Sequence, residues 1–125
     1  MKININNKEV KLNFWTEYRL VVKPEFNVPK CIARSAEFQM LLENKKYKQI
    51  RSYLNDTYVQ VSIGDDMFYD KATLNINDLQ NYSFKKGKEL ALHNLIKNNR
   101  DELLKQFTDL ELEELYEIFL TKLHG

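Results

Sequence analysis

Residues 2 to 14 alternate apolar and polar positions on both sides of a polar turn, Asn6-Asn7-Lys8. A period of two is typical of a strand with one buried face, and such a turn lets the chain fold back on itself. The pattern therefore predicts an N-terminal β-hairpin. Its inward-facing side chains are Ile3, Ile5, Val10, Leu12 and Phe14.

The next segment, residues 15 to 22, fits two secondary structures. Its aromatic and β-branched residues suit a strand, whereas Trp15, Tyr18 and Val22 also fit one face of a helix. The pattern leaves this choice open, and the choice decides whether the sheet is continuous. Residues 23 to 29 are predicted to form a loop, because each of their prolines disfavours helix in the residue before it.

The middle of the chain predicts a pair of helices. After Ser35, and again after Asn44, apolar residues recur at the spacing of three and four that marks one face of a helix. The first stripe consists of Phe38, Leu41 and Leu42, and the second of Tyr47, Ile50, Tyr53 and Leu54.

A second hairpin is predicted next. Apolar residues alternate over residues 59 to 63, Gly64-Asp65-Asp66 turns the chain, and residues 67 to 76 can return as the partner strand. Asn77 or Asp78 is then expected to cap the segment that follows.

The rest of the chain predicts a cluster of helices. Ser83 can cap a helix that ends at Asn98-Asn99, and a short helix follows. The apolar residues of the first helix are Phe84, Ala91, Leu92, Leu95 and Ile96, and those of the short helix are Leu103, Leu104 and Phe107.

The last helix has the best-defined start. Thr108 and Glu111 have the spacing of a capping box, and Phe107 and Leu112 stand at the two positions of a hydrophobic staple. At 100° per residue, most of its apolar residues fall within an arc of roughly 140°, so this face is predicted to join the protein's own core. The face consists of Leu112, Leu115, Tyr116, Phe119, Leu120 and Leu123.

Two apolar residues of this helix lie outside that face. Leu110 can pack on Phe107 or on the preceding helix, whereas Ile118 projects among acidic residues and Lys122. Single exposed apolar residues are common, so the alternative is that Ile118 contacts nothing. We interpret this surface as a candidate protein-binding face made of Glu111, Glu113, Glu114, Glu117 and Ile118.

Together these elements predict one α+β domain spanning residues 1–125, with an N-terminal β-hairpin, central helices, a second β-hairpin and a C-terminal helical cluster. The chain is 43% hydrophobic and has a net charge of +1. Its single cysteine, Cys31, favours a reducing compartment. No apolar run has the length of a membrane span or the character of a signal peptide. We therefore expect a cytoplasmic protein that does not enter the membrane.

No set of residues predicts catalysis. Paired aspartates such as those in Gly64-Asp65-Asp66 hold magnesium in polymerases, but glycine and aspartate are also ordinary turn residues. His93 and His124 have no companion at metal-ligand spacing. Basic neighbours can activate Cys31, but no residue is identified as its base. We expect no enzymatic activity, no metal and no cofactor.

Two lysine-rich clusters make nucleic-acid binding the alternative function. The first interleaves basic and aromatic residues, so that lysines can contact phosphates while tyrosine stacks on bases. The second begins a helix, where its positive charge opposes the helix dipole. Both clusters also fit the solvated side of a helix. Their members are Lys45, Lys46, Tyr47, Lys48 and Arg51, and Lys85, Lys86 and Lys88.

The stretch INNKEVKLNFWTEYRLV, residues 5 to 21, resembles the start of small phage tail-assembly chaperones. Those proteins often begin with an Ile-Asn-x-Lys-Glu hairpin, an aromatic end and then a helix. The resemblance implies a non-catalytic protein that binds other phage proteins, and it carries over no functional residue. The second hairpin is not expected of that family.

The charge of the chain is polarised. Residues 100 to 125 carry three basic and seven acidic residues, although the whole chain has a net charge of +1. Such polarity suits self-association or docking to a charged protein. We therefore predict a non-enzymatic accessory factor, encoded by a phage or mobile element, that binds a phage or host protein or a second copy of itself. The alternatives are a nucleic-acid binder and an inhibitor of a host nucleic-acid enzyme, whose acidic helix mimics backbone charge.

Overall fold

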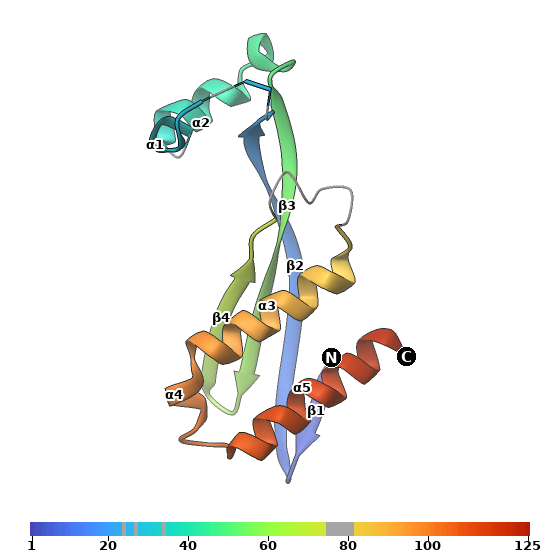
Figure 1. Cartoon of the computed structure of the whole chain (residues 1–125). Helices are drawn as coiled ribbons and strands as arrows, with labels where there is room; N and C mark the ends of the chain where they lie inside the picture. The colour runs from blue at the N-terminus through green and yellow to red at the C-terminus, as the bar shows by residue number, and fades with distance from the viewer. Residues whose placement is uncertain (24, 27, 34, 75–81) are drawn as a thin grey trace.

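Four antiparallel strands and two long helices form an elongated α+β structure (Figure 1). This computed structural model describes residues 1–23, 25–26, 28–33, 35–74 and 82–125. The strands follow one another in the sheet in chain order, β1-β2-β3-β4. The strands are β1 (Lys2–Ile5), β2 (Lys8–Val22), β3 (Arg51–Ile63) and β4 (Asp66–Ala72), and the helices are α1 (Lys30–Ala33), α2 (Ala36–Glu43), the 3₁₀-helix η1 (Lys45–Tyr47), α3 (Phe84–Asn98), α4 (Arg100–Leu103) and α5 (Asp109–His124).

Both predicted hairpins are present. Asn6 and Asn7 turn the chain between β1 and β2 with φ angles of 47° and 68°, which suit a two-residue hairpin turn. Gly64, with a φ of 60°, turns the chain between β3 and β4. β4 ends at Ala72, before the predicted end of this strand. The predicted cap at residues 77–78 lies outside the described residues.

The ambiguous segment, residues 15 to 22, is a strand. It continues β2 without a break, and β2 pairs with β3 from Val10 opposite Ile63 to Val22 opposite Arg51. This pairing satisfies the backbone groups of the segment along one edge, and its aromatic and β-branched side chains fit a pleated surface. A distant partner strand thus decides a choice that the local pattern left open.

The prediction of a second central helix is wrong. Ser35 does cap α2, as expected, and its hydroxyl accepts the N–H of the third residue on at 3.2 Å. After Asn44, however, the chain makes only the short η1 and enters β3 at Arg51, so Tyr53 and Leu54 lie on a strand. Tertiary pairing of β3 with β2 therefore overrides the helical spacing of the apolar residues.

β2 and β3 are much longer than their outer neighbours. β1 accompanies β2 only as far as Leu12, and β4 accompanies β3 only as far as Thr57. Beyond the four-stranded sheet, residues 17–22 and 51–56 form a two-stranded ribbon, here called the arm. Residues 23–50, which include α1, α2 and η1, are called the tip. Figure 1 shows the tip at one end of the molecule and the sheet with α3 and α5 at the other.

A buried carboxylate fixes the base of the arm. Asp56 is 3% exposed and accepts hydrogen bonds from Arg19 Nε at 2.8 Å and from the N–H of Leu74 at 2.9 Å. The Arg19 guanidinium also donates to the carbonyl of Leu74. A buried carboxylate is tolerated only where charge and hydrogen bonds replace its lost water. The network thus ties the chain that follows β4 to the arm.

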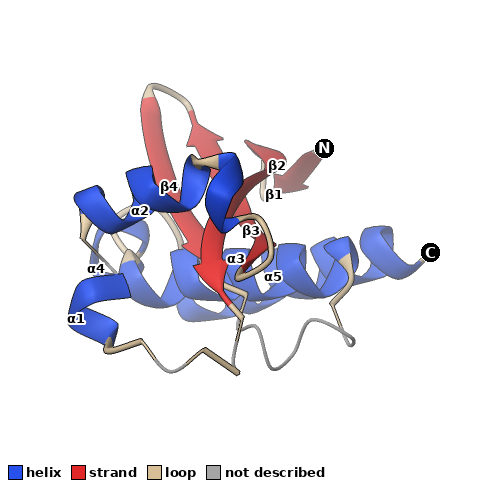
Figure 2. Cartoon of the chain, turned by 90° about the horizontal axis from the view of Figure 1, so that it is seen from above, coloured by secondary structure: helices blue, strands red, loops and turns tan. Residues whose placement is uncertain are grey.

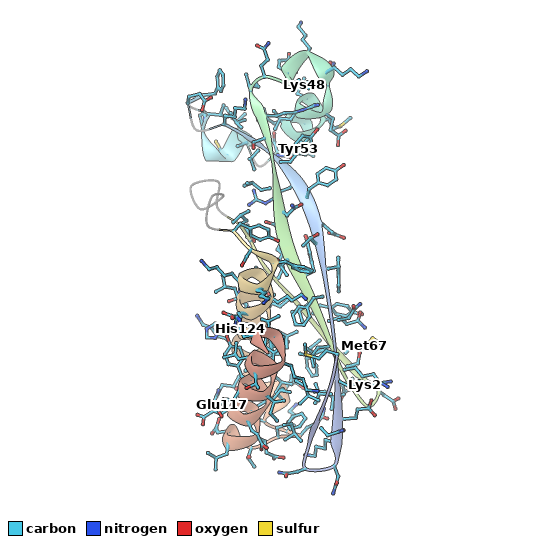
Figure 3. The ribbon with its side chains drawn as sticks, turned by 90° about the vertical axis from the view of Figure 1, so that its right-hand side faces the viewer. Lys2, Lys48, Tyr53, Met67, Glu117 and His124 are labelled. Atoms are coloured by element: carbon cyan, nitrogen blue, oxygen red, sulfur yellow. The ribbon has the colours of Figure 1, made fainter. Side chains whose placement is uncertain are left out.

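α3 and α5 cover one face of the sheet, and the opposite face of the sheet stays open (Figures 2 and 3). The predicted core faces of both helices pack inward, and Phe14 of β2 stacks on Phe119 of α5 with ring centroids 5.3 Å apart. Phe84 and Leu104, at the ends of α3 and α4, are 40% and 39% exposed. The buried helix residues are Ala91, Leu92 and Leu95 in α3 and Leu112, Leu115 and Phe119 in α5.

The close approach of α3 to β3 requires a glycine. A Cβ atom placed on Gly87 would lie 2.0 Å from Oγ1 and 2.9 Å from Cβ of Thr57, closer than real contacts allow. Thr57 is 1% exposed, so its side chain has no space into which it can turn away. Gly87 therefore sets the spacing between helix and sheet, although the sequence indicated only the lysines around it.

Replacing Gly87 with alanine is expected to destabilise the protein by about 1–3 kcal/mol, the usual cost of overpacking a buried contact. Helix propensity alone predicts the opposite sign, since alanine is favoured over glycine in a helix by about 1 kcal/mol. Urea denaturation measures the sign, with Lys85→Ala at an exposed position of α3 as the matched control. A Gly87→Ala protein as stable as the wild type would show that α3 moves away from β3 without cost.

Candidate protein-binding surfaces

The acidic residues of α5 have two different roles. Glu111 belongs to the helix start, where one carboxylate oxygen accepts the Thr108 N–H and the other accepts the Asn6 side-chain amide, both at 3.0 Å. The predicted capping box is thus confirmed, and it also ties α5 to the turn between β1 and β2. The carboxylates that remain exposed to a partner are those of Glu113, Glu114 and Glu117.

The burial of the two apolar residues outside the predicted core face of α5 differs from the prediction. Ile118 is half-buried and packs against the hydrophobic core, because α5 also contacts β1 and Lys122 donates to the carbonyl of Lys2 at 3.0 Å. Leu110, expected to pack on its neighbours, is 76% exposed. The apolar side chain that α5 offers to solvent is therefore Leu110.

α3 and α5 border a groove of about 400 Å³. Its apolar lining includes Tyr116, whose ring contacts His93 edge-on at 6.3 Å and whose hydroxyl donates to the Glu89 carbonyl at 3.4 Å. Burial raises the pKa of the Tyr116 hydroxyl, so this group stays a donor. The groove is lined by Ile96, Leu112 and Tyr116, by the basic Lys97 and Arg100 on one side, and by the acidic Asp109, Glu113 and Glu117 on the other.

The tip exposes its large apolar side chains. Among the tip residues that the structure describes, only Leu42 is buried. Met40 is 72% exposed, and Leu41, which belongs to the predicted helical stripe, is 50% exposed. Single exposed apolar residues are normal, whereas several on a segment without a core are typical of a binding surface. The exposed apolar residues of the tip are Phe26, Ile32, Met40 and Leu41.

Arg51 anchors the tip to the arm. Its Nη1 donates to the carbonyls of Leu42 at 2.5 Å and Asn44 at 3.4 Å, where α2 ends and leaves carbonyls without helical partners. The guanidinium also lies 5.7 Å from the ring centroid of Tyr53. Its buried Nε has no hydrogen-bond partner within the described part of the chain. Arg51, a predicted nucleic-acid contact, is thus engaged by the tip itself.

The two lysine clusters lie apart. Lys45, Lys46 and Lys48 are exposed on the tip, and Figure 3 shows Lys48 at its far end. The second cluster begins α3, which meets β3 at Thr57. From Arg51 to Thr57 the strand covers six residues, or about 20 Å. The two lysine clusters are therefore separate surfaces.

The second cluster is only partly exposed. Lys85 and Lys86 are exposed, but Lys88 is half-buried against two aromatic rings. Its Nζ lies 4.3 Å from the ring centroid of Phe84 and 5.7 Å from that of Phe14. Such contacts attract the ammonium to the ring faces. In the first cluster, Tyr47 is half-buried, so its ring is less open to a base than the sequence suggested.

The residues considered from the sequence for catalysis or metal binding lie in different parts of the structure. Cys31 is exposed on α1, at the tip. Asp66, the first residue of β4, accepts the Gln106 side-chain amide at 2.6 Å, and His124 contacts Glu89 near the end of α5. Within the described ranges, no three His, Cys, Asp or Glu side chains are grouped so that they could hold a metal ion.

An aromatic cluster that was not predicted from the sequence lies on the open face of the sheet. Trp15 and Tyr58 stand opposite each other on β2 and β3 with ring centroids 5.7 Å apart, and Lys71 Nζ lies 5.9 Å from the Tyr58 centroid. Met67 and Tyr69 of β4 are each 59% exposed. Period-two alternation was the available signal, since these residues alternate with buried ones.

The chain matches no protein-family model, no curated protein and no solved structure. Among the described residues, no helix is long and apolar enough to cross a membrane.

Acid is expected to weaken the start of α5 through Glu111. The Thr108 backbone and then the Asn6 amide, both donating to this carboxylate, hold the pKa of Glu111 below its ordinary value of 4.5. A carboxyl with a lowered folded-state pKa contributes stability above its unfolded-state pKa. That stability is lost as the pH falls through the folded-state pKa.

Glu111→Gln keeps an acceptor for the cap and removes the charge. Thermal unfolding followed from neutral pH to about pH 3, below the ordinary range of glutamate, should therefore show a shallower acid loss for this variant than for the wild type. Glu114→Gln, at an exposed position of the same helix, controls for the loss of one negative charge. Parallel curves for the wild type and Glu111→Gln would contradict the expectation.

Proposed function

We propose that the protein is a non-enzymatic accessory factor that binds another protein, and that the arm presents the tip as its binding surface. One observation carries the proposal. Of the tip residues that the structure describes, only Leu42 is buried, while four large apolar side chains are exposed. A folded segment of this kind gains stability when a partner covers it.

The tip has too small a core to order itself. Fixing the backbone of each residue costs about 1–2 kcal/mol, whereas burying one leucine stabilises by about 1.5–3 kcal/mol. Residues 23–50 therefore depend on the strands of the arm, on the hydrogen bonds of their short helices and on Arg51. Burial of Met40 and Leu41 against a partner would add the contacts that a core normally provides.

The exposed side chains indicate the chemistry of the partner. Methionine and leucine on one short helix suit an apolar groove, and the flexible thioether of methionine adapts to irregular surfaces. Lys45, Lys46 and Lys48 follow α2 directly and favour acidic residues beside that groove. We therefore infer a protein partner with an apolar groove and an acidic rim.

Nucleic-acid binding has weaker support. Arg51 is engaged with the end of α2, and Lys88 is packed on Phe14 and Phe84. These contacts leave fewer cations for phosphates, and a stretch of β3 of about 20 Å, from Arg51 to Thr57, separates the two clusters. An origin in a phage or mobile element stays part of the proposal, because residues 5 to 21 resemble the start of tail-assembly chaperones.

A substitution at the tip tests the proposal. Met40→Asp places a charge at an exposed position of α2 and should abolish retrieval of a protein partner from lysate of the expressing cells, while thermal unfolding stays near that of the wild type. Met67→Asp, at an exposed position of the open sheet face, is the matched control and should retain the partner. Retrieval of the same partner by Met40→Asp would count against the tip, and so would a wild-type protein that retrieves no other protein and does not associate with itself.

A further inference from the structure

We propose that the partner of the tip is a second copy of this chain, and that α2 of one copy packs into the groove between α3 and α5 of the next. This inference rests on the proposed function of the tip. The groove meets both requirements inferred for the partner. It is lined by Ile96, Leu112 and Tyr116, and α5 gives it an acidic side.

The charges of α2 and its following lysines complement those of the groove. Glu113 and Glu117 line the α5 side, and they complement Lys45 and the other exposed lysines that follow α2. The α3 side carries Lys97, and α2 itself carries two exposed acidic residues. Opposite charges can therefore pair when α2 lies in the groove. These acidic residues of α2 are Glu37 and Glu43.

The exposed apolar side chains of α2 match the apolar lining of the groove. Met40 and Leu41 are the two most exposed large apolar residues of the tip. The groove, at about 400 Å³, lies within the range of pockets that enclose small ligands, so it has room for side chains of one helical turn. α2 would then pack as a third helix against α3 and α5. Leu110, 76% exposed at the start of α5, extends the apolar surface next to the groove.

One chain cannot make this contact with itself. Figure 3 places Lys48 at the far end of the tip and Glu117 on the helical layer beside the sheet, with the arm between them. Each docking event therefore leaves one free tip and one free groove. The remaining tip and groove either dock on each other, which closes a symmetric dimer, or bind further copies, which builds a ring or an open filament.

The inference is tested by substitutions that reverse the charge of the tip in one variant and of the groove in another. One variant carries Lys45→Glu, Lys46→Glu and Lys48→Glu, and the other carries Glu113→Lys and Glu117→Lys. Each variant alone brings like charges together and should associate at least about tenfold more weakly than the wild type. An equimolar mixture restores opposite charges at both kinds of contact and should recover the assembly.

Sedimentation velocity over a wide range of protein concentration measures the association, and circular dichroism confirms that each variant is folded. Lys85→Glu and Lys11→Glu, at exposed positions away from both surfaces, control for the change in net charge and should assemble like the wild type. Self-associated species in the wild type, lost in each variant and recovered in the mixture, would support the inference.

A wild-type protein that stays monomeric at every concentration would overturn the inference. Assembly that neither charge variant weakens, or that the mixture fails to recover, would overturn it as well. These outcomes are separate from the test of the proposed function. A monomeric protein that still retrieves a different protein through Met40 would refute self-association and leave the tip as a protein-binding surface.

Discussion

The pairing of β2 with β3 along their whole length is the interaction on which the rest of the structure depends. At one end it forms the centre of the four-stranded sheet, and at the other it continues alone as the arm. A two-stranded ribbon is marginal by itself, because it offers no second layer on which to bury its side chains. Here the sheet that α3 and α5 cover holds the two strands in register, and the Asp56 network fixes the point where the arm leaves it.

Stability is therefore distributed unevenly along the molecule. The helical layer buries leucine and phenylalanine against the sheet, whereas the described part of the tip buries Leu42 alone. Regions with few buried contacts open locally at lower free energy than a packed core, and binding surfaces are often drawn from them. The arm separates the two regions, so a substitution such as Met40→Asp can alter binding without disturbing the core. The capping box and Gly87 act only on the core side.

Much of the core could be predicted from the sequence. The alternation of Ile3 with polar neighbours, the cap at Ser83 and the capping box of Thr108 with Glu111 are local features, and each formed as predicted. The candidate site was predicted less well. The sequence indicated Ile118 as the exposed residue of α5, but β1 lies against that side of the helix and leaves Leu110 exposed. Likewise, Arg51 has the character of a surface cation, yet it binds the end of α2.

The sequence by itself determined where turns and helices begin, because caps, glycines and periodic apolar residues act over a few positions along the chain. Only the tertiary structure decided that residues 15 to 22 and Tyr53 belong to strands, since the backbone bonds that stabilise a strand come from a partner far away in the sequence. The same holds for exposure. In the apolar stripe of α2, Leu42 is buried whereas Leu41 is 50% exposed, because the arm holds the tip away from the layer of α3 and α5.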